Sequence, residues 1–203
     1  MLFRSIRGKV KVASLGSGSK GNATLVESGD TTLLIDLGFS VREACSRLRR
    51  LGKQPEEISA ILVTHEHADH IHGVAPFARK YKTPVYLTPG TLASGRLGEV
   101  PAVREVNCQR NFSIDHLQVE PVAVPHDARE PCQYVISDDH TRLGVLTDLG
   151  HVSAHVADRY RSCDSLLLEC NHDVEMLKAG PYPWPDRKST RLNSSHQIIS
   201  YAV

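Results

Sequence analysis

The segment that most constrains the fold of this chain is residues 64–70, with the sequence THEHADH. It continues a β-branched, apolar segment over residues 58–64 that predicts a buried strand, so the cluster would lie in the loop after that strand. Three of the chain's 11 histidines fall within these positions. Imidazole groups at this spacing are typical of metal ligands, and the segment therefore predicts a metal site at a sheet edge.

Two further apolar segments end in a side chain that can bind a metal. His126 follows a predicted strand over residues 117–124, and Asp148 follows a predicted strand over residues 142–147. Taken singly, each of these residues would more often be a surface or hydrogen-bonded side chain than a ligand. Because ligand sites of α/β sheets form where strand ends converge, we expect both to join the histidine cluster.

This set of imidazole and carboxylate groups predicts two neighbouring divalent metal ions. Zinc is the expected ion, and manganese or iron also suits these ligands, because no soft thiolate is present. A carboxylate between the ions would hold them close, and Asp69 would orient the water molecule there or accept its proton. The expected ligands are His65, His67 and His126 for the first ion, Asp69 and His70 for the second, and Asp148 for both.

The alternative is a cluster of exposed loop histidines without any ligand. The four-residue pattern H-x-H-x-D-H would arise by chance in roughly one chain in five hundred of this composition. Its position at a strand end, and the two further strand ends that carry ligand-type side chains, favour the metal site.

Strand-like and helical segments alternate along the 203 residues, which predicts one layered α/β domain. The strand-like segments are residues 10–15, 23–27, 31–36, 58–64, 84–88, 117–124, 133–137, 142–147 and 165–170. The helical segments are residues 40–51, with Ser40 as cap and Gly52 as stop, 74–81, 91–97 and 152–160.

Composition excludes several classes of protein. The chain has 24 Lys and Arg against 23 Asp and Glu, so its overall charge attracts neither nucleic acid nor an anionic membrane. No apolar stretch is long enough to span a membrane, and the charged start has no apolar signal-peptide core, which favours a cytoplasmic protein. The five cysteines form no C-x2-C pair, so neither a disulfide framework nor a thiolate zinc site is indicated.

Taken together, these segments resemble the metallo-β-lactamase superfamily. The resemblance implies an α/β fold of the four-layer αβ/βα sandwich type, with the metals at one edge. It also implies the ligand roles given above, and a structural role for Asp36. The likeness is carried by residues 14–22, 33–36, 64–70, 125–127, 147–150 and 168–173.

Within the superfamily, the segments S-G-S-x-G-N, E-x-N-H-D and G-P-Y-P-W most resemble the bacterial WalJ/YycJ-like branch, regarded as exonucleases or phosphodiesterases. Ser19 and Asn22 of the first segment either face the metals or substrate or form a plain turn. The other nearby histidines are expected next to the ligands or at the surface and not as ligands themselves, and they are His72, His151 and His172.

The superfamily implies hydrolysis, and the carboxylate at Asp148 resembles phosphodiesterase, nuclease and thioesterase branches more than zinc β-lactamases. We expect a phosphodiesterase or exonuclease that acts on DNA or RNA, in which a metal-bridging hydroxide attacks phosphorus and Asp69 handles the proton. Two alternatives stay open: a glyoxalase-II-like thioesterase, and a non-catalytic metal-binding or regulatory protein. The oligomeric state is not indicated.

The C-terminal segment departs from the pattern of the family. The family supplies a further histidine from a Gly-His-Leu-Ser-Asn-like segment, which nothing here matches, since His196 lies in a different context. Residues 187–196 closely resemble a conceptual translation of sequencing-adapter DNA. Our hypothesis is therefore an incomplete metallohydrolase domain over residues 1–185, truncated at its C-terminus, and a non-native or disordered tail over residues 186–203.

Overall fold

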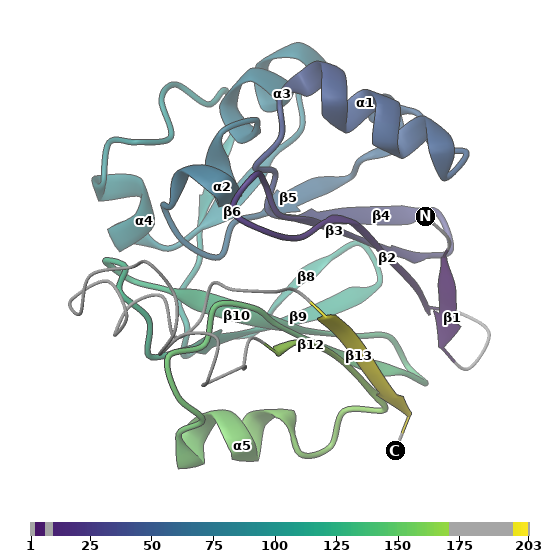
Figure 1. Ribbon diagram of the computed structural model, residues 1–203, viewed down its shortest axis with the longest axis vertical. Helices are drawn as coiled ribbons and strands as arrows, with labels where there is room; N and C mark the ends of the chain where they lie inside the picture. Colours follow the sequence, from purple (N-terminus) through teal and green to yellow (C-terminus); the bar gives the residue numbers. More distant parts are fainter. Residues whose placement is uncertain (1–2, 7–9, 171–196, 203) are drawn as a thin grey trace, which may run out of the picture.

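The computed structural model describes residues 3–6, 10–170 and 197–202. Two β-sheets pack face to face, and helices cover the outer surface of each sheet (Figure 1). The layers therefore run helix, sheet, sheet, helix, which confirms the expected αβ/βα sandwich.

The first sheet has seven strands, and their order in the sheet follows their order in the chain. Its first four strands are antiparallel, whereas the strands from the fourth to the seventh are parallel. Parallel neighbours need crossover connections, and these carry helices on one face of the sheet. The strands are β1 Arg4–Ile6, β2 Val10–Gly16, β3 Ala23–Ser28, β4 Thr31–Ile35, β5 Ala60–Leu62, β6 Val85–Leu87 and β7 Val103–Glu105.

The second sheet has the strand order β13-β12-β11-β10-β9-β8. Its strands β11 and β12 are parallel and are connected through a helix, and the other neighbours are antiparallel. The strands are β8 Phe112–Ile114, β9 Leu117–Ala123, β10 Cys132–Ser137, β11 Arg142–Leu146, β12 Ser165–Cys170 and β13 Gln197–Ala202.

Alternation of side chains along the strands builds three apolar clusters between the four layers. Leu25 and Leu34 pack toward the helices that cover the first sheet. Their chain neighbours Val26 and Leu33 point the opposite way, into the space between the two sheets. Val135 of the second sheet packs on the last helix. Each sheet is thus apolar on both faces, as a central layer requires.

The helices begin and end at recognisable signals. Ser40 caps the first helix by accepting a hydrogen bond from the Glu43 backbone N–H at 3.3 Å, and Gly52 follows its end with a φ of 74°. None of the described helices combines the length and apolar character needed to cross a membrane. The helices are α1 Val41–Arg50, the 3-10 helix η1 Pro55–Glu57, α2 Ala68–Ile71, α3 Val74–Tyr81, α4 Pro89–Ala93 and α5 Ala154–Tyr160.

The structure differs from the sequence-based expectations in several elements. The helix expected over residues 91–97 begins earlier, at Pro89, because Thr88 caps it and proline suits the first helical position. The short strands β1, β7 and β8 were not expected, because three residues are too few for a period to show.

Part of the segment proposed as a non-native or disordered tail lies within the described residues. Residues 197–202 form β13, which pairs antiparallel with β12. Residues 171–196 lie outside the described residues, and with them the expected boundary near residue 185, which stays a prediction.

Candidate metal centre

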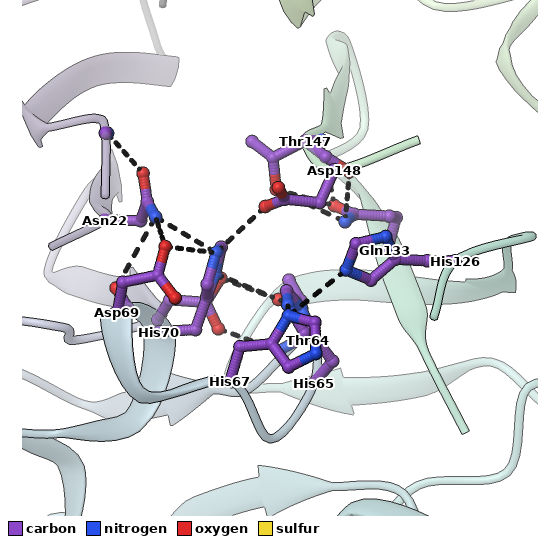
Figure 2. A network of polar contacts seen from close by, with 12 residues as sticks. Asn22, Thr64, His65, His67, Asp69, His70, His126, Gln133, Thr147 and Asp148 are labelled. Atoms are coloured by element: carbon purple, nitrogen blue, oxygen red, sulfur yellow. Dashed lines mark hydrogen bonds and ion pairs between the residues drawn. The ribbon is translucent and has the colours of Figure 1, made fainter. Parts of the chain in front are cut away.

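The three strand ends singled out in the sequence meet at one edge of the sandwich (Figure 2). Two groups of side chains can each hold an ion there, with the ligand atoms of each group all within 4.8 Å of one another. The short helix α2, where a loop was expected, turns Asp69 and His70 back toward the end of β5. The two groups are His65, His67 and His126, and His65, His70 and Asp148.

Hydrogen bonds outside the first group decide which ring nitrogens face its centre. The Nε2 atom of His67 lies 3.2 Å from the backbone oxygen of Asp127. A carbonyl oxygen can only accept, so we assign the proton of His67 to Nε2 and a lone pair to Nδ1. That Nδ1 lies 3.0 Å from His65 Nε2 and 3.4 Å from His126 Nε2.

The tautomer of His65 follows from its other ring nitrogen. The Thr64 hydroxyl donates its proton to Asp36 Oδ2 at 2.7 Å, so it can only accept from His65 Nδ1, which lies 2.9 Å away. The Nε2 of His65 therefore carries a lone pair. Lone pairs of His65 and His67 thus face each other at short distance, and this repulsive arrangement fits a cation held between the rings.

The second group is centred on the buried His70. Its Nδ1 lies 2.8 Å from Asp36 Oδ2, and its Nε2 lies 2.9 Å from Asp148 Oδ2. A histidine whose outer nitrogen bonds a carboxylate is the arrangement that orients metal ligands. Asp36 therefore has the structural role that the resemblance implied, and it acts on both groups, since it also binds Thr64.

Asn22 links the opening glycine-rich loop to this second group. Its Nδ2 donates to Asp69 Oδ2 at 3.1 Å and lies 3.0 Å from His70 Nε2. Its Oδ1 accepts from the Gly18 backbone N–H at 2.8 Å. Of the two residues considered in this loop, Asn22 thus lies at the site, whereas Ser19 is exposed.

The electrostatic environment of the two groups differs. Burial, followed by the neighbouring rings of His70, His126 and His67, holds the pKa of His65 well below its usual value. Burial alone would lower the pKa of His70 as well, but Asp36 and Asp148 outweigh it and hold that pKa well above its usual value. Burial therefore favours a neutral His65, as a metal ligand must be, whereas the carboxylates of Asp36 and Asp148 favour a cation at or next to the His70 ring.

Asp148 is held by contacts that reach across the chain. Its backbone adopts a left-handed conformation with a φ of 44°. The preceding Thr147 is fixed by Gln133, whose amide donates to Thr147 O at 2.6 Å and accepts from Thr147 N at 3.2 Å. The Gly150 backbone N–H donates to Pro125 O at 2.8 Å, which ties the Asp148 loop to the segment before His126. No local signal identified Gln133, because its role depends on a partner 14 residues away.

The other histidines considered in the sequence have different positions. His72 and His151 are exposed and belong to neither group. His172 and His196 lie outside the described residues. Asp69 is also absent from both groups, and its side chain, 24% exposed, has Oδ2 3.7 Å from His70 Nε2. The assignment of Asp69 as a ligand therefore stays a prediction.

Comparison with known families agrees with this geometry. Residues 31–196 match the family model described as the beta-lactamase superfamily domain. The chain belongs to this superfamily.

The curated relatives of this superfamily member include the exodeoxyribonuclease WalJ of Streptococcus pneumoniae. It is 38% identical over 182 residues, which are 86% of this chain and 67% of that protein. They also include the exodeoxyribonuclease YycJ of Bacillus anthracis, 34% identical over 90% of this chain and 70% of that protein. The chain is thus WalJ-like over most of its length.

Solved structures of the superfamily share the fold at low sequence identity. The metallo-beta-lactamase fold protein YhfI from Bacillus subtilis superposes with a TM-score of 0.69, at 14% identity, over 95% of this chain and 99% of that one. Zinc-bound PqqB from Methylobacterium extorquens also has a TM-score of 0.69, at 19% identity, over 91% and 80% of the two chains.

Proposed function

We propose that this superfamily member is a metal-dependent phosphodiesterase that cleaves nucleic acid, with DNA as its substrate. The observation that carries the proposal is the pair of adjoining ligand groups that share His65. Exodeoxyribonucleases that are 38% and 34% identical over most of this chain support the choice of substrate.

We assign six ligands to two divalent cations. His65, His67 and His126 would hold the first, through ring nitrogens that already converge. His70, Asp69 and Asp148 would hold the second, with Asp148 also reaching the first. The donor set fits, because it offers neutral imidazoles beside carboxylates. Zinc is the proposed metal, and manganese or iron suits the same ligands.

Two divalent cations held there would polarise a phosphodiester oxygen and lower the pKa of a water molecule to near neutrality. The residues of the chain then complete the chemistry. Asp69 is partly exposed and would accept the proton of the attacking water. Asn22 donates to Asp69 Oδ2 at 3.1 Å and so fixes the direction of the carboxylate. Asp36 keeps His70 in the tautomer that presents its Nε2 to the site.

Because the relatives are named for action on DNA, we propose a cytoplasmic location, where bacterial DNA lies. The near-neutral total charge of the chain leaves any contact with the DNA backbone to local groups of basic residues.

The proposal is tested by hydrolysis assays on the zinc- or manganese-loaded chain. We expect cleavage of bis-p-nitrophenyl phosphate and of end-labelled DNA, and none of a glutathione thioester. His67→Ala should abolish cleavage, whereas His72→Ala removes an exposed histidine of the same segment and should leave it intact. Thioester cleavage in place of phosphodiester cleavage would assign the chain to the thioesterase alternative. Bound metal without cleavage of any substrate would indicate a non-catalytic metal-binding protein.

A further inference from the structure

The helices that cover the first sheet concentrate the positive charge of the chain. The whole chain has 24 Lys and Arg and 23 Asp and Glu. Residues 41–53 and 74–82, which include α1 and α3, contain eight of these basic residues and a single acidic one, Glu43. The near-neutral total therefore combines a basic helix layer with an acidic excess elsewhere, and a local field of this kind can attract a polyanion.

Part of this charge is already neutralised within the fold. Arg47 pairs with Glu43 at 2.7 Å, and Lys53 pairs with Glu27 at 2.5 Å. The other exposed basic residues of α1, and those at the end of α3, form no ion pair within the described part of the chain. One of them, Arg79, donates to the backbone oxygen of Glu99 at 2.7 Å. We name the other five the helix-layer basic cluster, which consists of Arg42, Arg49, Arg50, Lys80 and Lys82.

The helices α1 and α3 lie side by side on the outer face of the first sheet (Figure 1). The two helices touch where Cys45 Sγ lies 3.2 Å from the Tyr81 hydroxyl. Arg42 and Arg49 stand three residues before and four residues after Cys45, so they share its face of the helix. Lys80 Nζ lies 5.1 Å from the centre of the Tyr81 ring. Three cations therefore gather around one contact between helices.

Helix stabilisation accounts for only part of this arrangement. Basic side chains in a last helical turn interact favourably with the helix dipole, which suits Arg49, Arg50 and Lys80. Arg42 lies in the first turn of α1, where the same dipole disfavours a positive charge. Like charges from two adjacent helices also repel each other. An anionic partner would offset both costs.

The cluster is connected to the metal centre by the course of the two helices. The Gly38 backbone N–H, two residues before the α1 cap, donates to Asn22 O at 2.9 Å. Gly73, directly before α3, donates to Leu37 O at 2.8 Å. Both helices therefore begin beside the metal centre and run away from it. The ten residues of α1 span roughly 15 Å, the length of about four to five nucleotides along one strand of B-form DNA.

We propose that the helix-layer basic cluster binds the phosphate backbone of a DNA strand whose end lies at the metal centre. This inference rests on the proposed function. Lys and Arg contacts to phosphates hold a strand without reading its sequence, as an exonuclease requires. Only strands longer than about five nucleotides would contact the full cluster, because Arg42 lies in the first turn of α1, beside the metal centre, and Arg49 lies in the last turn.

The test measures binding and not cleavage, so its result is independent of whether the proposed function holds. Fluorescence anisotropy would measure the binding of labelled phosphorothioate DNA strands to the metal-loaded full chain. One strand has about 20 nucleotides, well beyond the length of α1, and the other has about three nucleotides. The variant is Arg42→Gln, Arg49→Gln and Lys80→Gln combined. The matched control combines Arg104→Gln, Arg110→Gln and Arg161→Gln, which removes the same charge from exposed positions elsewhere.

We expect the variant to bind the long strand at least about tenfold more weakly than the control. The slope of log affinity against log salt concentration should become shallower by about 2, which is about 0.7 for each of the three lost phosphate contacts. For the short strand the difference between variant and control should be much smaller, because a strand of about three nucleotides reaches Arg42 but not the far end of the cluster. Equal losses of long-strand affinity in variant and control would overturn the proposal in favour of diffuse attraction. Tighter binding of a polyglutamate peptide than of DNA of equal charge would overturn it too, in favour of an acidic protein partner. Absence of hydrolysis of bis-p-nitrophenyl phosphate would contradict the proposed function alone.

Discussion

Asp36 Oδ2 lies 2.8 Å from His70 Nδ1, and both side chains are buried. The same carboxylate accepts hydrogen bonds from the Thr64 backbone N–H at 2.8 Å and from the Thr64 hydroxyl at 2.7 Å. Since Thr64 in turn sets the tautomer of His65, one carboxylate orients an imidazole in each ligand group. Asp36 has a φ of 60°, a conformation that Asp tolerates better than most residues.

Replacing Asp36 by Asn should weaken metal binding while keeping the fold. The amide cannot accept as many hydrogen bonds as the carboxylate, so the orientation of His70 and Thr64 is lost. We expect metal affinity to fall by about 10- to 100-fold, as for other residues that orient ligands. Titration against a competing chelator measures this, with Asp30→Asn in the exposed turn as control. Equal affinities of both variants would mean that Asp36 does not orient the ligands.

Asp148→Asn should remove one of the two metals selectively. Asn also tolerates the left-handed backbone at this position, so the loop can keep its conformation. The imidazoles of His65, His67 and His126 form a ligand group that can hold an ion after Asp148 is replaced. We therefore expect metal content to fall from two ions to about one per chain, and bis-p-nitrophenyl phosphate hydrolysis to fall at least about tenfold.

Elemental analysis of the purified variant measures the metal content, with Asp139→Asn in the exposed turn after β10 as control. An Asp148→Asn chain that holds two ions and turns over at the normal rate would refute the assigned role.

Gln133→Leu should destabilise the fold and disturb the loop that carries Asp148. The side chain of Gln133 is buried and satisfies both the N–H and the C=O of Thr147. Leucine would leave these backbone groups without partners, at a cost of about 1–3 kcal/mol in the free energy of unfolding. Urea denaturation measures this loss. Gln118→Leu, at an exposed position of β9, should change the stability by about 0.5 kcal/mol or less.

Glu27 should make stability depend on acidic pH. It lies between Lys11 Nζ at 2.7 Å and Lys53 Nζ at 2.5 Å. Burial alone would raise the pKa of Glu27, but its hydrogen bonds and charge interactions with Lys11 and Lys53 lower that pKa below its usual value. Because the folded state lowers this pKa, the stabilisation is present above the unfolded pKa of about 4.3 and is lost as pH falls through the folded pKa.

Glu27→Gln should therefore be less stable than the original chain at neutral pH, and the two stabilities should converge as the pH falls below about 4. Chemical denaturation at a series of pH values measures both curves, with the exposed Glu56→Gln as control. Parallel curves for the original chain and Glu27→Gln would show that Glu27 contributes no pH-dependent stability.

Local patterns predicted most of the elements that position the site. Period-two and apolar runs located β3, β4, β9 and β11 to within a residue or two, and helical spacing with the Ser40 cap located α1. The three strand ends that carry His65, His126 and Asp148 were expected to meet, and they do. These features depend on neighbours in the chain, which is why a single sequence reveals them.

Other parts of the site depend on residues far apart in the chain. Asn22 meets Asp69 across 47 positions, and Asp36 meets His70 across 34. The short helix α2 lacks the length for a periodic signal and forms where Asp69 and His70 pack against the residues after β4. No period or motif encodes such contacts, since they arise only when separate strands have paired.

The sequence by itself determined the fold class and the set of ligand-type side chains, because alternating apolar residues and a histidine cluster are local properties. Tertiary structure alone decided which ring nitrogens face the site, how Asp36 orients both ligand groups, and how basic residues from α1 and α3 gather at one seam. The physical reason is that a proton on an imidazole is placed by its hydrogen-bond partner, and that partner reaches the ring only after folding.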